Sequence, residues 1–207
     1  MYQYMQIPVL TTIVLIFILW LHYEIHKTSG NAKKAYEDFL KREKDANFSR
    51  IKDISDLNYI IISADRLPVK DNPDATINSY RDIILSLSGK KAINLRGFTN
   101  TELKLQYGAA NLKQLTEYDN NYMTLVSILQ KWADRLYIQD SLPDCMVVLE
   151  YAAACQSDVT KTYKLLAKLY RLQNTPDKTS GLAALVEATK IPDKKKLLAE
   201  LKVISNS

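Results

Sequence analysis

The sequence predicts a mainly α-helical protein, in which an N-terminal transmembrane helix precedes a water-soluble domain built from helix hairpins. Two observations predict this class. The 28 Lys and Arg residues and the 23 Asp and Glu residues all lie after residue 23, and the neutral stretch before them contains the apolar block Ile7–Leu21. From Asn111 onward, apolar residues recur at spacings of three and four, which is the periodicity of amphipathic helices.

The block Ile7–Leu21 reads as a membrane anchor, because a helix of roughly 20 apolar residues crosses a hydrocarbon core. A cleaved secretory signal would need a basic start and a small-residue cleavage site, and the sequence has neither. A buried core helix is the other alternative. The polar residues of this block are only Thr11 and Thr12, so it has no solvated face, and its length favours a membrane span. We predict an anchor over residues 1–26 that crosses the membrane through residues 7–23.

The residues that flank the anchor predict its orientation. Aromatic side chains stand near both ends, as in the belts at membrane interfaces: Tyr2, Tyr4, Trp20 and Tyr23. No cation precedes the apolar block, whereas six follow within 25 residues of it: Lys27, Lys33, Lys34, Lys41, Arg42 and Lys44. The positive-inside rule then predicts a single-pass protein of the cell membrane with its C-terminal domain in the cytoplasm.

Residues 27–47 are rich in charges of both signs and predict a polar juxtamembrane helix or stalk. Asn31 can cap a new helical turn at its start. The basic residues near the membrane favour contact with anionic lipid head groups, while the mixture of signs favours a simple solvated helix. Both interpretations stay open.

Residues 48–125 predict a mixed or helical N-terminal part of the soluble domain. Within it, residues 57–63 form a short β-branched run that is typical of a strand. Residues 74–88 show helical spacing before Gly89, and residues 92–95 resemble a second strand. The segment 57–95 is therefore either a small βαβ unit or a helix between two extended loops.

Helical spacing continues to the end of the chain, with a proline near several expected helix starts, where proline is accepted. The predicted helices cover residues 111–137, 142–155, 159–173, 178–189 and 193–204. Cys145 and Cys155 would lie about 15 Å apart along one helix, which is beyond disulfide reach. We expect both to be buried thiols.

Two segments of this region align at a period of 34 residues. In each, two large residues, one small residue and another large residue share one helix face: Leu129, Trp132, Ala133 and Leu136 in the first, and Tyr163, Leu166, Ala167 and Tyr170 in the second. A small–large–small set follows at Cys145, Leu149 and Ala152, and again, after a two-residue shift, at Gly181, Leu185 and Ala188. The small residue matters because it lets the next helix approach closely.

This pattern resembles tetratricopeptide repeats. The resemblance implies tetratricopeptide-like hairpins over residues 126–207, closed by the last helix as a cap; an ordinary α-bundle is the alternative. More loosely, the segments Asn47–Lys52 and Asn100–Gly108 resemble small single-pass membrane proteins of an uncharacterised Gram-positive bacterial family. That second resemblance implies no activity.

The candidate binding residues form a basic stripe on the helix predicted at 159–173: Lys161, Lys164, Lys168 and Arg171. In tetratricopeptide-like repeats, the first helix of each pair lines the concave groove, and the resemblance places this stripe on the groove side. A basic groove favours acidic segments of other proteins. A plain solvated face is the alternative. Nucleic acid is not expected, because aromatic residues do not alternate with the stripe.

No catalytic, cofactor or metal site is predicted. His22 and His26 share a helix face at a spacing of four, but zinc would need a further ligand and no third histidine exists. Phosphate-binding and nucleophile motifs are absent from the sequence. We therefore expect a non-enzymatic, membrane-anchored cytoplasmic module for protein–protein interaction. The alternative is a structural subunit of a membrane-associated assembly that oligomerises through its anchor and stalk.

Protease added outside intact cells should leave residues 24–207 uncut, because the excess of Lys and Arg lies only on the C-terminal side of the anchor. Immunoblotting of the C-terminal domain before and after digestion measures this, with detergent-permeabilised cells as the control in which the domain is cut. Digestion in intact cells would reverse the topology.

Overall fold

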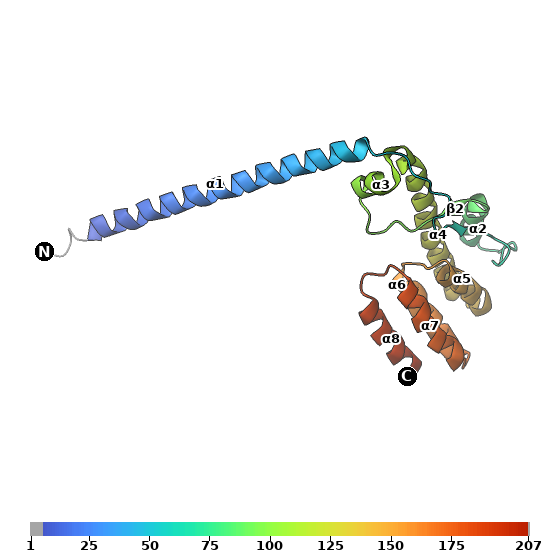
Figure 1. Cartoon of the computed structure of the whole chain (residues 1–207). Coiled ribbons are helices and arrows are strands. Elements are labelled where there is room, and N and C mark those ends of the chain that lie inside the picture. Colours follow the sequence, from blue (N-terminus) through green and yellow to red (C-terminus); the bar gives the residue numbers. More distant parts are fainter. Residues whose placement is uncertain (1–5, 207) are drawn as a thin grey trace. The chain divides into compact units, whose positions relative to one another are not determined.

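The first element of the computed structural model, which describes residues 6–206, is one continuous helix. Helix α1 spans Gln6–Asn47, 42 residues in all (Figure 1), and so is about 63 Å long at 1.5 Å per residue. Residues 27–47 are helical as part of α1, but the new turn expected at Asn31 is wrong, because Asn31 lies inside α1. No proline follows Pro8 in this helix, so no backbone N–H is missing that would interrupt it.

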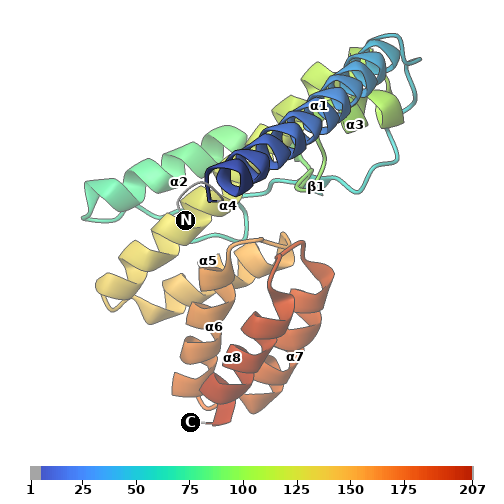
Figure 2. The same cartoon turned by 90° about the vertical axis from the view of Figure 1, so that its left-hand side faces the viewer.

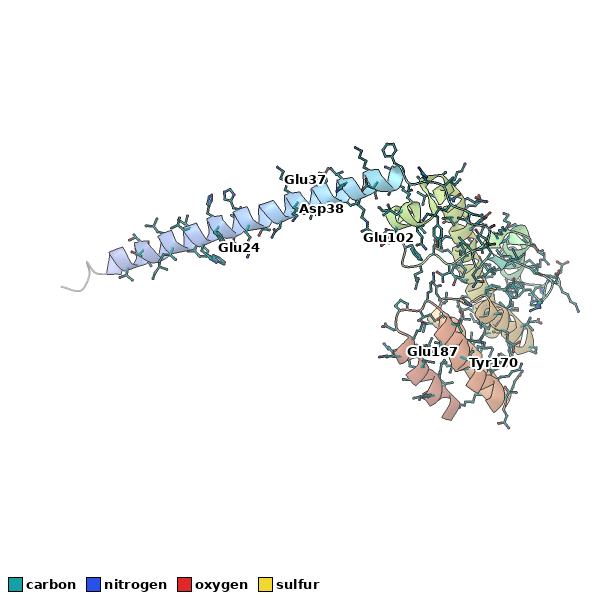
Figure 3. The ribbon with its side chains drawn as sticks, viewed as in Figure 1. Glu24, Glu37, Asp38, Glu102, Tyr170 and Glu187 are labelled. Atoms are coloured by element: carbon teal, nitrogen blue, oxygen red, sulfur yellow. The ribbon has the colours of Figure 1, made fainter. Side chains whose placement is uncertain are left out.

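The N-terminal half of α1 exposes apolar side chains on all sides. From Val9 to Leu21 these side chains are between 42% and 69% exposed, and Figure 3 shows side chains projecting all around the helix. Among the described residues, α1 is the one helix that is long and apolar enough to span a membrane. Trp20 and Tyr23 are exposed near the end of the apolar block; Tyr2 and Tyr4 lie outside the described residues.

The chain divides into two compact units, and the first contains α1, residues 48–53 and residues 99–112. Helix α3 (Asn100–Tyr107) packs there against the end of α1, and the short 3₁₀ helix η1 (Ala109–Asn111) packs against α3. The Thr99 hydroxyl accepts a hydrogen bond from the Glu102 N–H, and the Glu102 carboxylate accepts one from the Thr99 N–H. This capping box, Thr99 followed three residues later by Glu102, is the sequence signal for α3; apolar periodicity does not reveal this short helix.

Charged and polar contacts attach α3 to α1. Lys104 Nζ lies 3.3 Å from Glu43 Oε2 and 2.8 Å from Asn47 Oδ1, and Ala46 is fully buried. Nearby, Ser49 Oγ donates to the Lys104 carbonyl at 2.5 Å and accepts from the Ala109 N–H at 3.1 Å. Helix α1 thus ends in a contact with α3.

The second unit contains residues 54–98 and the rest of the chain after residue 112. The unit boundaries therefore differ from the expected ones after residues 47 and 125. Strand β1 (Ile60–Ile61), helix α2 (Ala75–Leu87) and strand β2 (Lys91–Ala92) begin the second unit. The strands pair antiparallel, Ile60 with Ala92, so the βαβ interpretation is wrong: such a unit needs parallel strands.

The helices of the second unit follow the sequence prediction closely. They are α4 (Leu112–Ile138), α5 (Leu142–Ala154), α6 (Thr160–Leu172), α7 (Pro176–Ala188) and α8 (Lys194–Asn206). Helix α6 packs against α5, α7 and α8, and α7 also packs against α8; Figure 2 shows α6, α7 and α8 side by side. The mainly α-helical class is confirmed.

Two turns of this unit repeat at the predicted period of 34 residues. Asp140 after α4 and Asn174 after α6 both have a left-handed backbone, with φ of 58° and 54°. The next N–H in each case donates to a carbonyl five residues back, from Ser141 to Leu136 and from Thr175 to Tyr170. Asp and Asn tolerate this conformation better than most residues, so the hairpins α4–α5 and α6–α7 close with the same geometry.

The residues predicted for the repeat core are buried, except on α7. Exposure is 0–2% for nine of them and 6% for Tyr170: Leu129, Trp132, Ala133, Leu136, Leu149, Ala152, Tyr163, Leu166 and Ala167. The set Gly181, Leu185 and Ala188 is wrong, because all three are exposed and α7 instead buries Leu182, Val186 and Thr189. The register shift is three residues rather than two, which is close to one helical turn and so keeps nearly the same face inward.

Gly108 joins α3 to η1 at a position that only glycine fits. Its φ is +94°, and an added Cβ would lie 2.5 Å from the Arg50 carbonyl oxygen and 2.6 Å from the Ile51 Cα. Gly89 has a similar φ of +78° but open space around it. Comparing the two positions separates backbone strain from the clash.

Gly108→Ala should lower the free energy of unfolding by about 3 kcal/mol or more, since it combines strain with a backbone clash. Gly89→Ala, the matched control, should cost only about 1–2 kcal/mol. Thermal unfolding in detergent micelles measures both. Hydrogen exchange adds a local measurement at the Lys52 N–H, which donates to the Tyr107 carbonyl; equal protection in both variants would show that the contact with residues 50–51 is unimportant.

Candidate functional site

The basic stripe lies on the face of α6 that points away from the core. Tyr163, Leu166 and Ala167 on the opposite face are fully buried, whereas Lys161, Lys168 and Arg171 are exposed and Lys164 is half-buried. The spacing of three and four predicted this separation of faces. The structure therefore brings the four predicted binding residues together along one helix face.

Two of these cations are paired with carboxylates from the helices on either side. Lys161 Nζ lies 2.6 Å from Asp134 Oδ2 on α4, and Lys164 Nζ lies 2.5 Å from Glu200 Oε2 on α8. The hydrogen bond from Lys164 holds the pKa of Glu200 below its ordinary value. Water screens pairs as exposed as these, so they contribute little to stability and the lysines can exchange them for other carboxylates at little cost.

The other two cations, Lys168 and Arg171, form no ion pair with any residue in the described part of the chain. They lie in the C-terminal half of α6, one and two turns beyond Lys164. The stripe therefore has a paired half and a half that is available to a partner.

A cavity of about 160 Å³ lies beside the paired half, between α6 and α8. Leu197 forms its apolar part, and its polar lining alternates in sign: Thr160, Lys164, Asp193, Lys196 and Glu200. The alternation leaves the cavity nearly neutral. It can accommodate a polar side chain but does not by itself select an anion.

Buried hydrogen bonds fix the position of Asp134. Gln130 Nε2 donates to Asp134 Oδ1 at 2.8 Å, and Gln130 Oε1 accepts from Thr162 Oγ1 at 2.7 Å. Gln130 and Thr162 are both buried, so α4 and α6 are joined where a broken hydrogen bond would cost about 1–3 kcal/mol. Asp134 is consequently held facing Lys161, which also prevents it from moving with a ligand.

The cysteines and histidines carry no sign of chemistry. Cys145 and Cys155 are free and buried, as predicted, and burial raises the pKa of Cys145 to about 12 and that of Cys155 to about 11. Both thiols stay protonated at neutral pH and are poor nucleophiles. The rings of His22 and His26 pack edge to face, with their centroids 4.5 Å apart.

The distribution of charge along the chain also points to this region, although no motif marks it. Residues 160–207 contain ten Lys and Arg residues but only four Asp and Glu residues. Residues 1–159 contain 18 Lys and Arg residues and 19 Asp and Glu residues. The formal net charge of +5 therefore resides in helices α6–α8. A comparison of net charge between segments would have found this without a repeat pattern.

No protein family, characterised protein or solved structure matches the chain. The resemblances to tetratricopeptide repeats and to a Gram-positive membrane family therefore stay predictions.

Proposed function

We propose that the chain is a single-pass protein of the cell membrane whose cytoplasmic, tetratricopeptide-like module binds acidic segments of other proteins. It acts by binding and needs no cofactor. The observation that carries this proposal is the stripe on α6, because it presents cations between two helices that already supply carboxylates as partners. Asp134 and Glu200 occupy positions that the carboxylates of an acidic partner would take.

Two features support the tetratricopeptide-like arrangement. The turns after α4 and α6 share their backbone conformation and hydrogen bonds at a spacing of 34 residues, and the turn after α5, at Gln156, has the same geometry. Helix α8 packs against both α6 and α7, which is where the first helix of a third repeat would pack. In such an array α4, α6 and α8 form the concave side, and the stripe lies on it.

The cations bind an acidic segment in a definite order. Lys168 and Arg171 attract an acidic segment first, since they are exposed and pair with no carboxylate of the described residues. Lys164 is reached by exchanging Glu200 for a partner carboxylate, and this exchange costs little because the existing pair is partly exposed. Cytoplasmic placement rests on the cations that follow the anchor.

Charge reversal at the unpaired half tests the proposal. The double variant Lys168→Glu/Arg171→Glu should bind a fluorescent octaglutamate peptide roughly 10-fold more weakly or worse, because attraction becomes repulsion. Glu200→Gln should instead strengthen binding a few-fold, since it frees Lys164. Fluorescence anisotropy of the full chain in nanodiscs measures both at low salt. Lys164→Glu is unsuitable, because it would face Glu200 and destabilise the helix contact.

The matched control is Lys113→Glu/Lys131→Glu, which reverses two exposed cations of α4 outside the stripe. Equal loss in the control would mean that the peptide senses only net charge. Binding that Glu200→Gln weakens would show that Glu200 supports the site rather than competing for it.

A structural subunit is the second candidate, and one observation favours it. Tyr36, Phe39 and Leu40 share one face of α1, at spacings of three and four, and are 47–61% exposed among the charged residues of the stalk. Figure 3 shows Glu37 and Asp38 of the same segment. Exposed apolar groups in a charged helix fit lateral contact between copies of the chain.

If this candidate is right, Phe39→Glu should dissociate an oligomer of the full chain, whereas Lys41→Glu, on the same stalk, should not. Chemical crosslinking in intact membranes followed by gel electrophoresis gives the measurement. A parent chain that yields only monomer would remove the candidate.

A further inference from the structure

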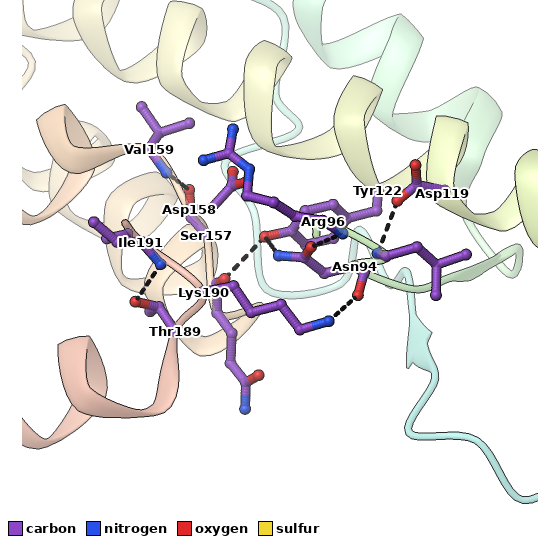
Figure 4. Close-up of polar contacts among 12 residues, drawn as sticks. Asn94, Arg96, Asp119, Tyr122, Ser157, Asp158, Val159, Thr189, Lys190 and Ile191 are labelled. Atoms are coloured by element: carbon purple, nitrogen blue, oxygen red, sulfur yellow. Dashed lines mark hydrogen bonds and ion pairs between the residues drawn. The ribbon is translucent and has the colours of Figure 1, made fainter. Parts of the chain in front are cut away.

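A second cavity, of about 290 Å³, lies in the second unit between residues 94–96, α4 and the turn before α6. Figure 4 shows its polar side chains. It is separate from the 160 Å³ cavity between α6 and α8, because none of the four stripe cations lines it.

Hydrogen bonds between its own residues hold the walls of this cavity in place. Asn94 Nδ2 donates to Tyr122 Oη at 2.9 Å, and Tyr122 Oη donates to the Gln156 carbonyl at 2.9 Å. The Asn94 carbonyl accepts from Lys190 Nζ at 2.7 Å. Burial, chiefly, raises the pKa of Tyr122, so its hydroxyl is neutral at physiological pH. The cavity is thus preformed rather than shaped by a ligand.

Three charged side chains line this cavity: Arg96 and Asp158 on one side, and Asp119 on the other. Arg96 Nε lies 2.8 Å from Asp158 Oδ2, and the Arg96 side chain is 50% exposed whereas that of Asp158 is 10% exposed. The terminal nitrogens of Arg96 make no hydrogen bond with any residue in the described part of the chain. In Figure 4 the Arg96 guanidinium and Asp158 lie to one side of Tyr122 and Asp119 to the other.

Asp119 uses one of its two carboxylate oxygens. Its Oδ1 accepts the Leu95 N–H at 2.9 Å, which leaves Oδ2 able to accept a further donor. Between the charged groups the lining is apolar, with Val126 buried and Met123 about half exposed. The cavity therefore offers a guanidinium, a carboxylate oxygen and an apolar surface at separate places.

We propose that this cavity binds a small zwitterion, namely a free α-amino acid with an apolar side chain. The carboxylate would bind the terminal nitrogens of Arg96, which suit a planar anion. The ammonium would donate to Asp119 Oδ2, and the side chain would cover Met123 and Val126. Asp158 pairs with Arg96 Nε, so the lining carries two carboxylates and one guanidinium. A simple anion is therefore disfavoured, whereas a zwitterion can use Asp119 Oδ2 and the terminal nitrogens of Arg96 together. The volume lies at the lower end of the range for ligand sites, about 300–1,000 Å³.

Saturation-transfer NMR on the full chain in nanodiscs tests this, with L-leucine as the probe. We expect saturable binding with a Kd of about 1 mM or tighter. L-leucinamide lacks the carboxylate, N-acetyl-L-leucine lacks the ammonium and glycine lacks the apolar side chain, so each should bind at least several-fold more weakly.

The decisive variant is Asp119→Asn, which keeps an oxygen to accept the Leu95 N–H but removes the negative charge. It should weaken leucine binding about 10-fold or more, as expected for loss of a charge-assisted hydrogen bond. Glu117→Gln, two residues away and exposed on the same helix, is the control and should bind leucine as the parent does. Thermal unfolding verifies that both variants fold.

Three results would overturn the proposal: no saturable signal from leucine, equal binding of leucine and N-acetyl-leucine, or unchanged binding by Asp119→Asn. None of them bears on the stripe, because the octaglutamate measurement uses residues on the exposed face of α6. The two proposals can therefore fail separately.

Discussion

The close contact at Ala167 is the constraint on which the rest of the helical unit depends. Helix α6 packs against α5, α7 and α8 at once, and Ala167 on its inner face has no exposed surface. A side chain this small lets neighbouring helices approach closely, and the same pattern recurs at Ala133 on α4. Once the inner face of α6 is fixed, the stripe has to face outward, because the two faces belong to one rigid helix.

The sequence was sufficient to predict helices but not the details of their ends and pairings. Apolar periodicity located α4 to α8 because each helix buries a continuous face. The face of α7 was misassigned because Gly181 and Ala188 fit the small positions of the repeat, whereas the structure buries Leu182 and Val186. The two short strands lie at or beside the predicted segments 57–63 and 92–95, but their antiparallel pairing was beyond prediction. This pairing depends on hydrogen bonds such as Gly89 N–H to the Ile62 carbonyl, between residues far apart in sequence.

For the candidate site, too, the sequence predicted the helix face but not the contacts between helices. The four cations could be predicted to share a face from their spacing alone. That Lys161 and Lys164 are paired could not, because their partners come from α4 and α8, 27 and 36 residues away. The second cavity was invisible in the sequence for a similar reason, since Arg96, Asp119 and Asp158 belong to three different segments.

The weakness of the ion pairs is what makes a binding role physically reasonable. A cation that is buried and fully paired would resist exchange, because removing its partner would leave an uncompensated charge. The Lys161 side chain is 63% exposed and that of Lys164 is 38% exposed, so water screens both and either can change partner cheaply. Gln130 and Thr162 meanwhile hold α4 against α6 through buried hydrogen bonds that do not involve the stripe. Under the proposed function, charge exchange on the exposed face would therefore leave the packing beneath it fixed, so the helices could bind an acidic segment without unfolding.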